Sequence, residues 1–534
     1  MRRFRCVSAG RFLLVTGALG LALFALAGCG TQRGAADKGA VYTVADPTGD
    51  WGFPSPFAHY PRGPGYIRMH FLFDTLVWKD EKGFVPALAE SWQYLKDENA
   101  YVFRLRKDVT WHDGKKFTAR DVVFTVDYLQ KNRYQWTDVS IVTRAEAPDD
   151  YTVKLVLARP HAPFMNNFAA TVPIIPEHVW QGVTQPEQFT DKRAAIGTGP
   201  FKFVDYNKEQ GTYLYEANPN YYGGRPKVAQ LRFVKINAEV VPAALRQKQV
   251  NAAQVPPEVV GDLEKEGFTV IKGAHDWVAK LMINHTRPPL DNPDFRRALA
   301  HAVDRQALVD TCLRGHGLPG GAGLLAPDNP WYNPQAELYP YDPARTAEIL
   351  TGLGYVKKGQ YFEKDGRVLE LELLVSGEGV GVPGSPRERE AEMIKSQLEK
   401  AGIKVNLRGL EAKTLDQRVG EWKFDLALSG HGGIGGDPDI LNRVILGQSF
   451  LSARYDRSGE LNELLKRQLS AMDPEVRKSI VARIQEVYAR EMPALPLYHP
   501  TWYWAHDGKV NLFYTYQGVG TGVPIPLNKL AFVR

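Results

Sequence analysis

The stretch that decides the fold begins with Pro86-Ala87-Leu88-Ala89-Glu90-Ser91-Trp92 and continues with Phe103-Arg104-Leu105-Arg106, Trp111-His112-Asp113-Gly114 and Ala119-Arg120-Asp121-Val122. Alternating apolar and polar residues predict strands at 101–106 and 151–157, and residues 109–111 are expected to continue the first of them. The pair Asp113-Gly114 predicts a turn. Thr118 and Asp121 form a capping box, which predicts a helix from that point to about Lys131.

Outside this stretch, strands and helices alternate along the chain. Strand patterns occur at 41–45, 369–375, 403–407 and 424–428. Helical periodicity occurs at 292–314, 343–352, 386–401, 459–472 and 474–491. A chain of 534 residues is too long for one compact core, so two or three domains are expected. The alternation of element types predicts an α/β fold.

The N-terminus has the pattern of a secretory signal. Four arginines at positions 2, 3, 5 and 11 precede an apolar run from Phe12 to Ala27, which is short for a membrane span. Leu26-Ala27-Gly28-Cys29 resembles the lipobox of bacterial lipoproteins, in which the cysteine carries lipid and the chain is cut just before it. We therefore expect a signal peptide at 1–28, lipidation at Cys29, a polar tether at 29–40, and a location in the periplasm or on the outer face of a bacterial membrane.

Charge and cysteine usage narrow the class of protein. The net charge is +6, and removal of the four arginines of the signal leaves 6 − 4 = +2, which does not favour nucleic-acid binding. Of the three cysteines, Cys6 would be lost with the signal and Cys29 would carry lipid. Cys312 would then have no partner for a disulfide and is expected to be a small buried residue.

Further blocks follow the first four in a fixed order. They are Gly197-Thr198-Gly199-Pro200-Phe201, Asn218-Pro219-Asn220-Tyr221-Tyr222-Gly223-Gly224-Arg225-Pro226, Phe295-Arg296-Arg297-Ala298-Leu299, Ala302-Val303-Asp304-Arg305, Ala401-Gly402-Ile403-Lys404-Val405, Phe424-Asp425-Leu426 and Pro496-Leu497-Tyr498-His499. The ordered set resembles the family 5 extracytoplasmic solute-binding proteins, the oligopeptide-, dipeptide- and nickel-binding group of ABC importers. The resemblance covers nearly all of the chain that follows the signal.

This resemblance implies a two-lobed α/β fold of the periplasmic-binding-protein kind (type II, cluster C), with an extra subdomain on lobe one. Two hinge strands join the lobes, which close around a ligand and so give the transporter a signal to read. By analogy, lobe one is expected at 41–57, 183–272 and 492–534. The extra subdomain is expected at 58–182 and lobe two at 273–491.

The resemblance also points to a glycine-rich loop at 430–436 that reaches the ligand. In peptide-binding members, an aspartate in this loop holds the amino group of the peptide, and here that position is Ile434. Dipeptide binders use an arginine in a second loop, and the matching residues 376–385 contain none. Both charged anchors are thus missing. The glycines either expose backbone N–H groups to oxygen atoms of the ligand or make room for a bulkier ligand.

The expected ligand contacts come from three places. Asp50 and Trp51 follow the first strand, where family members place such contacts. Trp277 lies at the expected hinge crossing, where it could stack on a ligand or close the cleft. The glycine-rich loop supplies His431, Gly432, Gly433 and Ile434.

Several chemical motifs fail in their context. His112 and Asp113 suggest a metal pair, but neighbouring strand residues point to opposite faces and the family uses this motif as a structural turn. Residues 430–435 satisfy G-x-G-x-x-G without a helix opening at the glycines. His431-Gly432-Gly433 is similar to an esterase oxyanion loop, yet the chain has no G-x-S-x-G elbow. We therefore expect no catalytic residue, no cofactor and no resident metal.

The predicted function is that of a lipid-anchored, monomeric solute-binding protein, not an enzyme, that delivers an oligopeptide-like or other polar organic solute to the permease of an ABC importer. An alternative within the family is a binding protein for nickel or a metal chelate, for which His431 and His275 would have to come together. An alternative from another class is a lipid-anchored hydrolase built around His431.

Overall fold

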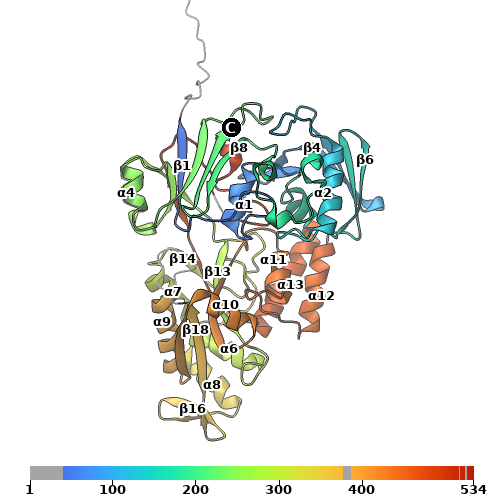
Figure 1. The fold of residues 1–534 in the computed structure, drawn as a ribbon. Coiled ribbons are helices and arrows are strands. Elements are labelled where there is room, and N and C mark those ends of the chain that lie inside the picture. Colours follow the sequence, from blue (N-terminus) through green and yellow to red (C-terminus); the bar gives the residue numbers. More distant parts are fainter. Residues whose placement is uncertain (1–39, 377–386, 516, 524–525) are drawn as a thin grey trace, which may run out of the picture. The chain divides into compact units, whose positions relative to one another are not determined.

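The computed structural model describes residues 40–376, 387–515, 517–523 and 526–534, and contains two α/β lobes with a sheet in each (Figure 1). The sheet of lobe I has the strand order β12 (Thr269–Lys272), β22 (Tyr503–His506), β11 (Ala252–Val255), β1 (Val41–Asp46), β10 (Gln230–Lys235), β9 (Thr212–Ala217) and β8 (Phe201–Asn207). β1 runs parallel to β10 and β11, whereas the other neighbours are antiparallel. Helices α4 (Val241–Arg246) and α5 (Val260–Lys265) belong to the same lobe.

A four-stranded antiparallel sheet forms the extra part of lobe I. Its strand order is β4 (Ala89–Leu95), β5 (Ala100–Leu105), β7 (Thr152–Leu157) and β6 (Val142–Asp149). The nearby elements are α1 (Gly63–His70), β2 (Val77–Lys79), β3 (Phe84–Pro86), α2 (Ala119–Lys131) and α3 (Glu177–Trp180). One hydrophobic cluster includes Phe103 and Trp111 from this part and Phe233 from the seven-stranded sheet, so the two sheets share a core.

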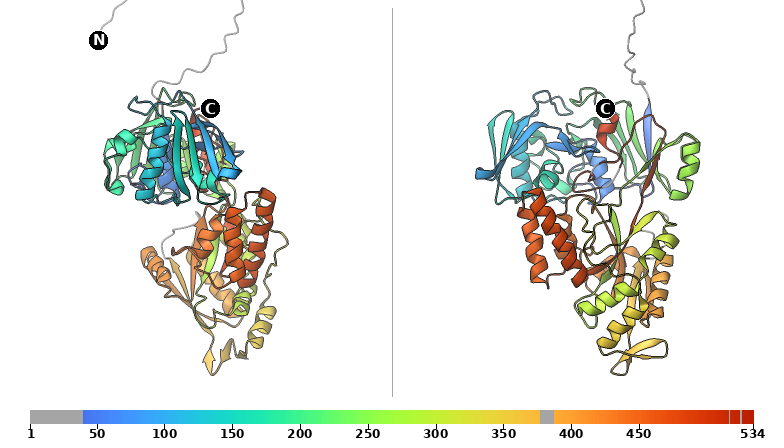
Figure 2. Two further views of the ribbon diagram at one scale, coloured as in Figure 1. Left: turned by 90° about the vertical axis from the view of Figure 1, so that its right-hand side faces the viewer. Right: turned by 180° about the vertical axis from the view of Figure 1, so that it is seen from behind.

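Lobe II is built around a mixed sheet with the strand order β14 (Gly317–Pro319), β21 (Ala494–Pro500), β13 (Trp277–Ile283), β20 (Leu426–Gly432), β18 (Glu370–Ser376) and β19 (Lys404–Leu410). Its helices are α6 (Pro293–Ala302), α7 (Arg305–Cys312), α8 (Pro343–Gly352), α9 (Arg387–Lys400), α10 (Ala412–Gly420), α11 (Ile440–Leu446), α12 (Gly459–Ser470) and α13 (Pro474–Glu491). Figure 2 shows α12 and α13 lying side by side. A small sheet of β15 (Val356–Lys358), β16 (Tyr361–Lys364) and β17 (Arg367–Val368) completes the lobe.

Short helical turns complete the described elements. They lie at Lys96–Glu98, Met165–Ala169, Pro186–Gln188, Lys192–Ala195, Pro257–Val259 and Lys529–Phe532. No helix in the described part of the chain is both long enough and apolar enough to cross a membrane.

The local sequence signals around residues 111–131 are confirmed. α2 begins after Thr118, and the reciprocal bonds of the capping box with Asp121 are present. The predicted turn forms as well, because Trp111 donates its backbone N–H to the carbonyl of Lys115 at 2.8 Å and Gly114 has φ +89°. The predicted continuation of the strand over 109–111 is wrong, since only one isolated bridge, at Thr110, forms there.

Two longer predictions needed correction. The periodicity at 292–314 comes from two helices, α6 and α7, which are separated at Val303 because the side chain of Asp304 caps the second helix. The strand predicted at 424–428 is β20, which runs four residues further, to Gly432. The expected signal, tether and lipidation at Cys29 lie outside the described residues. Cys312 is buried, as predicted, and burial raises the pKa of its thiol to about 11.

Candidate functional site

The two lobes are joined by two chain crossings that lie next to each other. The first connects β12 to β13 through residues 273–276, and the second connects β21 to β22 through residues 501–502. Gly273 on the first donates its N–H to the carbonyl of Trp502 on the second, at 2.9 Å. A change in the angle between the lobes must therefore pass through this pair of segments, as in hinge closure.

His275 links the two crossings to lobe II. Its Nδ1 lies 2.7 Å from Oδ2 of Asp328, and its Nε2 lies 2.9 Å from the hydroxyl of Thr501. A carboxylate oxygen accepts, so Nδ1 donates to Asp328. The hydrogen bond from His275 lowers the pKa of Asp328. Both ring nitrogens are thus engaged within the hinge.

The glycine-rich loop at 430–436 begins in the last three residues of β20 and continues beside the first crossing. β20 pairs with β13 in a register that places Gly432 opposite Trp277 and Gly430 opposite Ala279. A Cβ at Gly430 would lie 1.7 Å from the indole of Trp277, so that side chain fits only because position 430 has none. Gly433 has φ +82°, a conformation that favours glycine.

The rest of the loop is equally close to the protein's own atoms. A Cβ at Gly435 would lie 2.7 Å from Cβ of Asp276, and one at Gly436 would lie 3.0 Å from Cα of Gly522. The sequence left open whether the glycines expose N–H groups or make room for a ligand. In the structure, Gly430 and Gly435 make room for two hinge side chains, Trp277 and Asp276.

Ile434 and His431 have different surroundings. The side chain of Ile434 is fully buried in a hydrophobic cluster with Val278 and Leu441, so a contact with a ligand would have to come from its backbone. Its backbone N–H already donates to the carbonyl of Asp276 at 3.3 Å. His431 donates from Nδ1 to the carbonyl of Gly432 at 2.5 Å. Burial, with help from nearby cations, lowers the pKa of His431 to about 3, so the imidazole is neutral.

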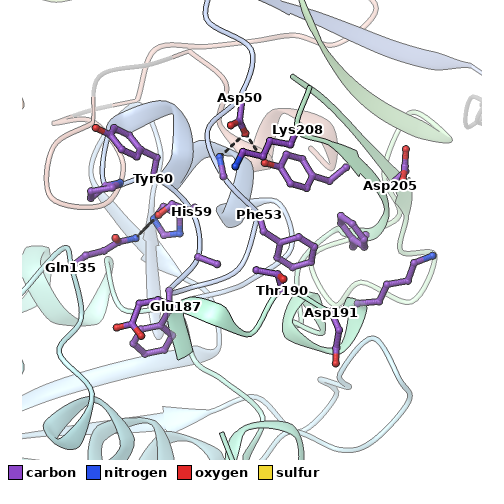
Figure 3. Close-up of a pocket in the computed structure, with 17 residues that line it drawn as sticks. Asp50, Phe53, His59, Tyr60, Gln135, Glu187, Thr190, Asp191, Asp205 and Lys208 are labelled. Atoms are coloured by element: carbon purple, nitrogen blue, oxygen red, sulfur yellow. Dashed lines mark hydrogen bonds between the residues drawn. The ribbon is translucent and has the colours of Figure 1, made fainter. Parts of the chain in front are cut away.

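Asp50 and Trp51 lie in lobe I, and Asp50 lines a cavity of about 990 Å³ there (Figure 3). Oδ1 of Asp50 accepts from the hydroxyl of Tyr206 at 2.6 Å and from the N–H of Gly52 at 2.9 Å. The indole N–H of Trp51 donates to Asp46 at 3.0 Å. Of the seven predicted ligand contacts, Asp50 and Trp51 therefore lie in lobe I, and the other five lie at the hinge.

The wall of this lobe I cavity is aromatic and its rim is charged. The ring centroids of Phe53 and Phe203 lie 5.1 Å apart. His59 also lines the cavity; it donates from Nδ1 to the carbonyl of Ser55 and accepts from the indole N–H of Trp136 at 2.7 Å. Burial lowers the pKa of His59 to about 4, which keeps it neutral in this role. These hydrogen bonds connect the segment around His59 to the loop that follows α2, and both line the cavity.

The lobes also touch beside α11. The side-chain amide of Asn167, from the extra part of lobe I, donates to Oδ2 of Asp439 at 2.8 Å. Nearby, the N–H of Ala162 donates to the carbonyl of Leu469 at 2.7 Å. Burial raises the pKa of Asp439 to about 6. Both hydrogen bonds would break if the lobes separated at this edge.

Sequence reasoning missed a buried lysine in the hinge strand. Lys280 is 1% exposed, donates to the carbonyl of Leu451 at 2.6 Å, and has no carboxylate within 4.0 Å among the described residues. Burial lowers its pKa to about 7. Since Lys280 pairs with Ser429 and Val278 pairs with His431, Lys280 and His431 lie on one face of the sheet.

Because Lys280 is buried, we expect its replacement by methionine to stabilise the protein by an amount that depends on pH. Lys280→Met should be more stable than the wild type at pH 6, because the wild type must bury a charge or give up a proton on folding. Above pH 7 the folded state has lost that proton, whereas the unfolded chain keeps it to about pH 10.5. Wild-type stability should therefore rise with pH in this window, by up to about 1.4 kcal/mol per pH unit, and the advantage of Lys280→Met should shrink.

Urea unfolding at pH 6.0, 7.5 and 9.0 checks this. The same substitution at an exposed lysine, Lys478→Met, serves as the control. A constant difference between Lys280→Met and the wild type across the three pH values would contradict the prediction.

No group of three or more histidine, cysteine or acidic side chains in the described ranges is placed to hold a metal ion. His275 and His431, which the chelate alternative would bring together, are engaged with Asp328 and Thr501 in one case and with Gly432 in the other. The metal-chelate alternative therefore gains no support from these two histidines.

Comparison with known proteins gives one consistent family. Residues 83–449 match the family described as bacterial extracellular solute-binding proteins, family 5. Di/tripeptide-binding protein 2 of Pseudomonas aeruginosa is 28% identical over 445 residues, which cover 78% of this chain and 81% of that protein. Heme-binding protein A of Haemophilus influenzae is 27% identical over 537 residues, which cover 91% and 94%.

Solved structures show the same fold. NikA from Brucella suis, in complex with Fe(III)-EDTA, superposes with a TM-score of 0.78 at 22% identity and covers 93% of this chain and 99% of its own. The predicted two-lobed α/β architecture is therefore confirmed. The family match extends over more than half of the sequence, and its members bind solutes and are not enzymes. The chain belongs to the bacterial extracellular solute-binding proteins of family 5.

Proposed function

We propose that this protein is the lipid-anchored, extracytoplasmic solute-binding component of an ABC importer and that it holds an oligopeptide-like or other polar organic solute at the hinge between its lobes. The observation that carries this proposal is the hinge itself. Two adjacent crossings bring Trp277, Asp276 and the loop after β20 together with the segment that contains Tyr514 and Gly522. Groups from both lobes thus meet where closure would enclose a solute.

The relatives bind ligands of different kinds. One is named for di- and tripeptides and another for heme, and one solved structure holds a metal chelate. Trp277 offers a flat apolar surface, while His431, Gly432 and Gly433 offer polar groups. Asp50 and Trp51 would contribute from lobe I. Such a mixture of a few polar groups with aromatic surface is typical of small-molecule sites.

Native mass spectrometry of the protein purified from its own cells tests the proposal. The expected result is a complex that releases a small polar organic molecule on denaturation. An affinity near 1 µM would correspond to about 8 kcal/mol of binding free energy. Release of a metal chelate would favour the nickel-type alternative. Turnover of acyl esters that is lost in His431→Ala would contradict a pure binding role.

The lipid anchor gives a separate prediction. Cys29→Ser should abolish the incorporation of fatty acid into the protein, because Cys29 is the proposed site of the acyl chains that anchor it. Metabolic labelling with a fatty acid checks this. Cys312→Ser is the matched control and should be labelled like the wild type. Incorporation of the labelled fatty acid into the Cys29→Ser protein at the wild-type level would contradict lipidation at Cys29.

A further inference from the structure

Asp276 lies in the first hinge crossing and is a buried carboxylate with an unused oxygen. The residue is 2% exposed. Oδ2 accepts a hydrogen bond from the hydroxyl of Tyr514, a residue of lobe I. Oδ1 is also buried and has no hydrogen-bond partner in the described part of the structure. A buried polar atom without a partner destabilises the folded state, so such atoms are rare in proteins.

The described part of the chain offers this carboxylate no ion-pair partner, since no lysine, arginine or histidine there lies within ion-pair distance of it. The carboxylate of Asp328 also acts on Asp276 and disfavours its ionisation. Burial is the larger effect, and together they raise the pKa of Asp276 to about 7. Strongly perturbed pKa values of this kind cluster at functional sites.

Asp276 lies next to the glycine-rich loop. Its Cγ would lie 3.2 Å from a Cβ at Gly435, and its carbonyl accepts from the N–H of Ile434. The next residue is Trp277, whose indole covers Gly430. The carboxylate therefore stands beside the loop in which the side chain of Ile434 carries no charge and is turned into a hydrophobic cluster.

We propose that Asp276, oriented by Tyr514, binds a protonated amino group of the solute, which makes the solute class an organic molecule with a free ammonium group. This inference rests on the proposed function, because it assumes that the solute lies at the hinge. An ammonium ion has three donors and a positive charge, and so supplies what Oδ1 lacks. The aromatic rings of Trp277 and Tyr514 suit a neighbouring cation as well.

The proposal gives binding a defined pH dependence. Without a ligand, Asp276 holds a proton below about pH 7, and it must release that proton to pair with an ammonium group. Affinity should therefore fall by up to about tenfold per pH unit as the pH drops below 7. The other titratable groups that face Asp276 or its neighbours are Tyr514, Asp328, His275 and His499. His275 is engaged with Asp328, and burial lowers the pKa of His499 to about 4.

The test uses trialanine and N-acetyl-trialanine as probes in isothermal titration of the full-length protein. The wild type should bind trialanine and should bind the acetylated probe about 30-fold more weakly or worse. Asp276→Asn keeps the shape and removes the charge, so it should lose the same factor for trialanine and show little change for the acetylated probe. Trialanine binding in two buffers of different ionisation enthalpy should reveal proton release near pH 6.5.

Two further variants distinguish a role of the Asp276 carboxylate from a general effect on solute binding. Tyr514→Phe keeps the carboxylate and should lose less affinity than Asp276→Asn. Asp310→Asn, the same chemical change at an exposed position on α7, should bind like the wild type. Equal binding of trialanine by the wild type and Asp276→Asn would overturn the role of Asp276 and leave solute binding intact.

Absence of binding by either probe would overturn a short peptide as the solute that carries the ammonium group. The solute found by native mass spectrometry would then decide the proposed function independently. Recovery of a solute without any amino group would likewise overturn the inference and leave the solute-binding function standing.

Discussion

Gly430→Ala is expected to displace the indole of Trp277 and to destabilise the protein by about 1–3 kcal/mol, the usual cost of overpacking. The new Cβ would lie 1.7 Å from Cζ2 and 2.1 Å from Cη2 of the ring. The ring is rigid, so either it turns out of its place or β13 and β20 move apart. Because Trp277 is a proposed ligand contact, solute affinity should fall as well, by roughly tenfold or more.

Urea unfolding and ligand titration of Gly430→Ala measure the two effects separately. The control is Gly409→Ala on β19, where no atom lies within 4 Å of the new Cβ, and its stability should change by less than about 0.5 kcal/mol. In Trp277→Ala/Gly430→Ala the clash is absent, so its total cost should be smaller than the sum of the two single changes. Strict additivity would show that the ring does not occupy the space above Gly430.

The sequence predicted best what depends on neighbouring residues. The turn at Gly114 and the start of α2 at Thr118 follow from local backbone chemistry, and both occur in the structure. The extension of β20 to Gly432 was missed because glycines signal a loop. Here they continue a strand, since β13 supplies the pairing and Trp277 fills the space left by the missing side chain.

For the candidate site, the sequence indicated a place in the fold and not the contacts of the side chains. The loop at 430–436 does lie at the hinge, but Ile434 packs into a hydrophobic cluster and its side chain is no substitute for a charged anchor. Asp276 was not singled out because nothing local distinguishes it. Its burial arises from Gly435, 159 positions further along, and from Tyr514, 238 positions further along. Only the folded chain brings these residues together.

Lys529→Met should cause the largest loss of stability, about 3–5 kcal/mol, because it leaves a buried carboxylate without its counter-ion. Lys529 pairs with Asp74, and the two side chains are 1% and 0% exposed. Lys529 also donates to the carbonyl of Phe73 at 2.9 Å, and its ammonium lies 4.2 Å from the ring centroid of Trp78. The pair ties the last helical turn of the chain to the residues that follow α1. Its loss should loosen the C-terminal segment that contains the hinge residue Tyr514.

A double substitution separates the charge effect from the packing effect. Asp74 accepts further hydrogen bonds from Thr198 at 3.1 Å and from Tyr221 at 3.3 Å, so Asp74→Asn keeps an acceptor there and removes the charge. Asp74→Asn/Lys529→Met should therefore be more stable than Lys529→Met alone. Lys466→Met breaks an exposed ion pair with Glu463 and should cost at most about 1 kcal/mol. If Lys529→Met and Lys466→Met unfold at the same urea concentration, the buried pair does not hold the C-terminal segment in place.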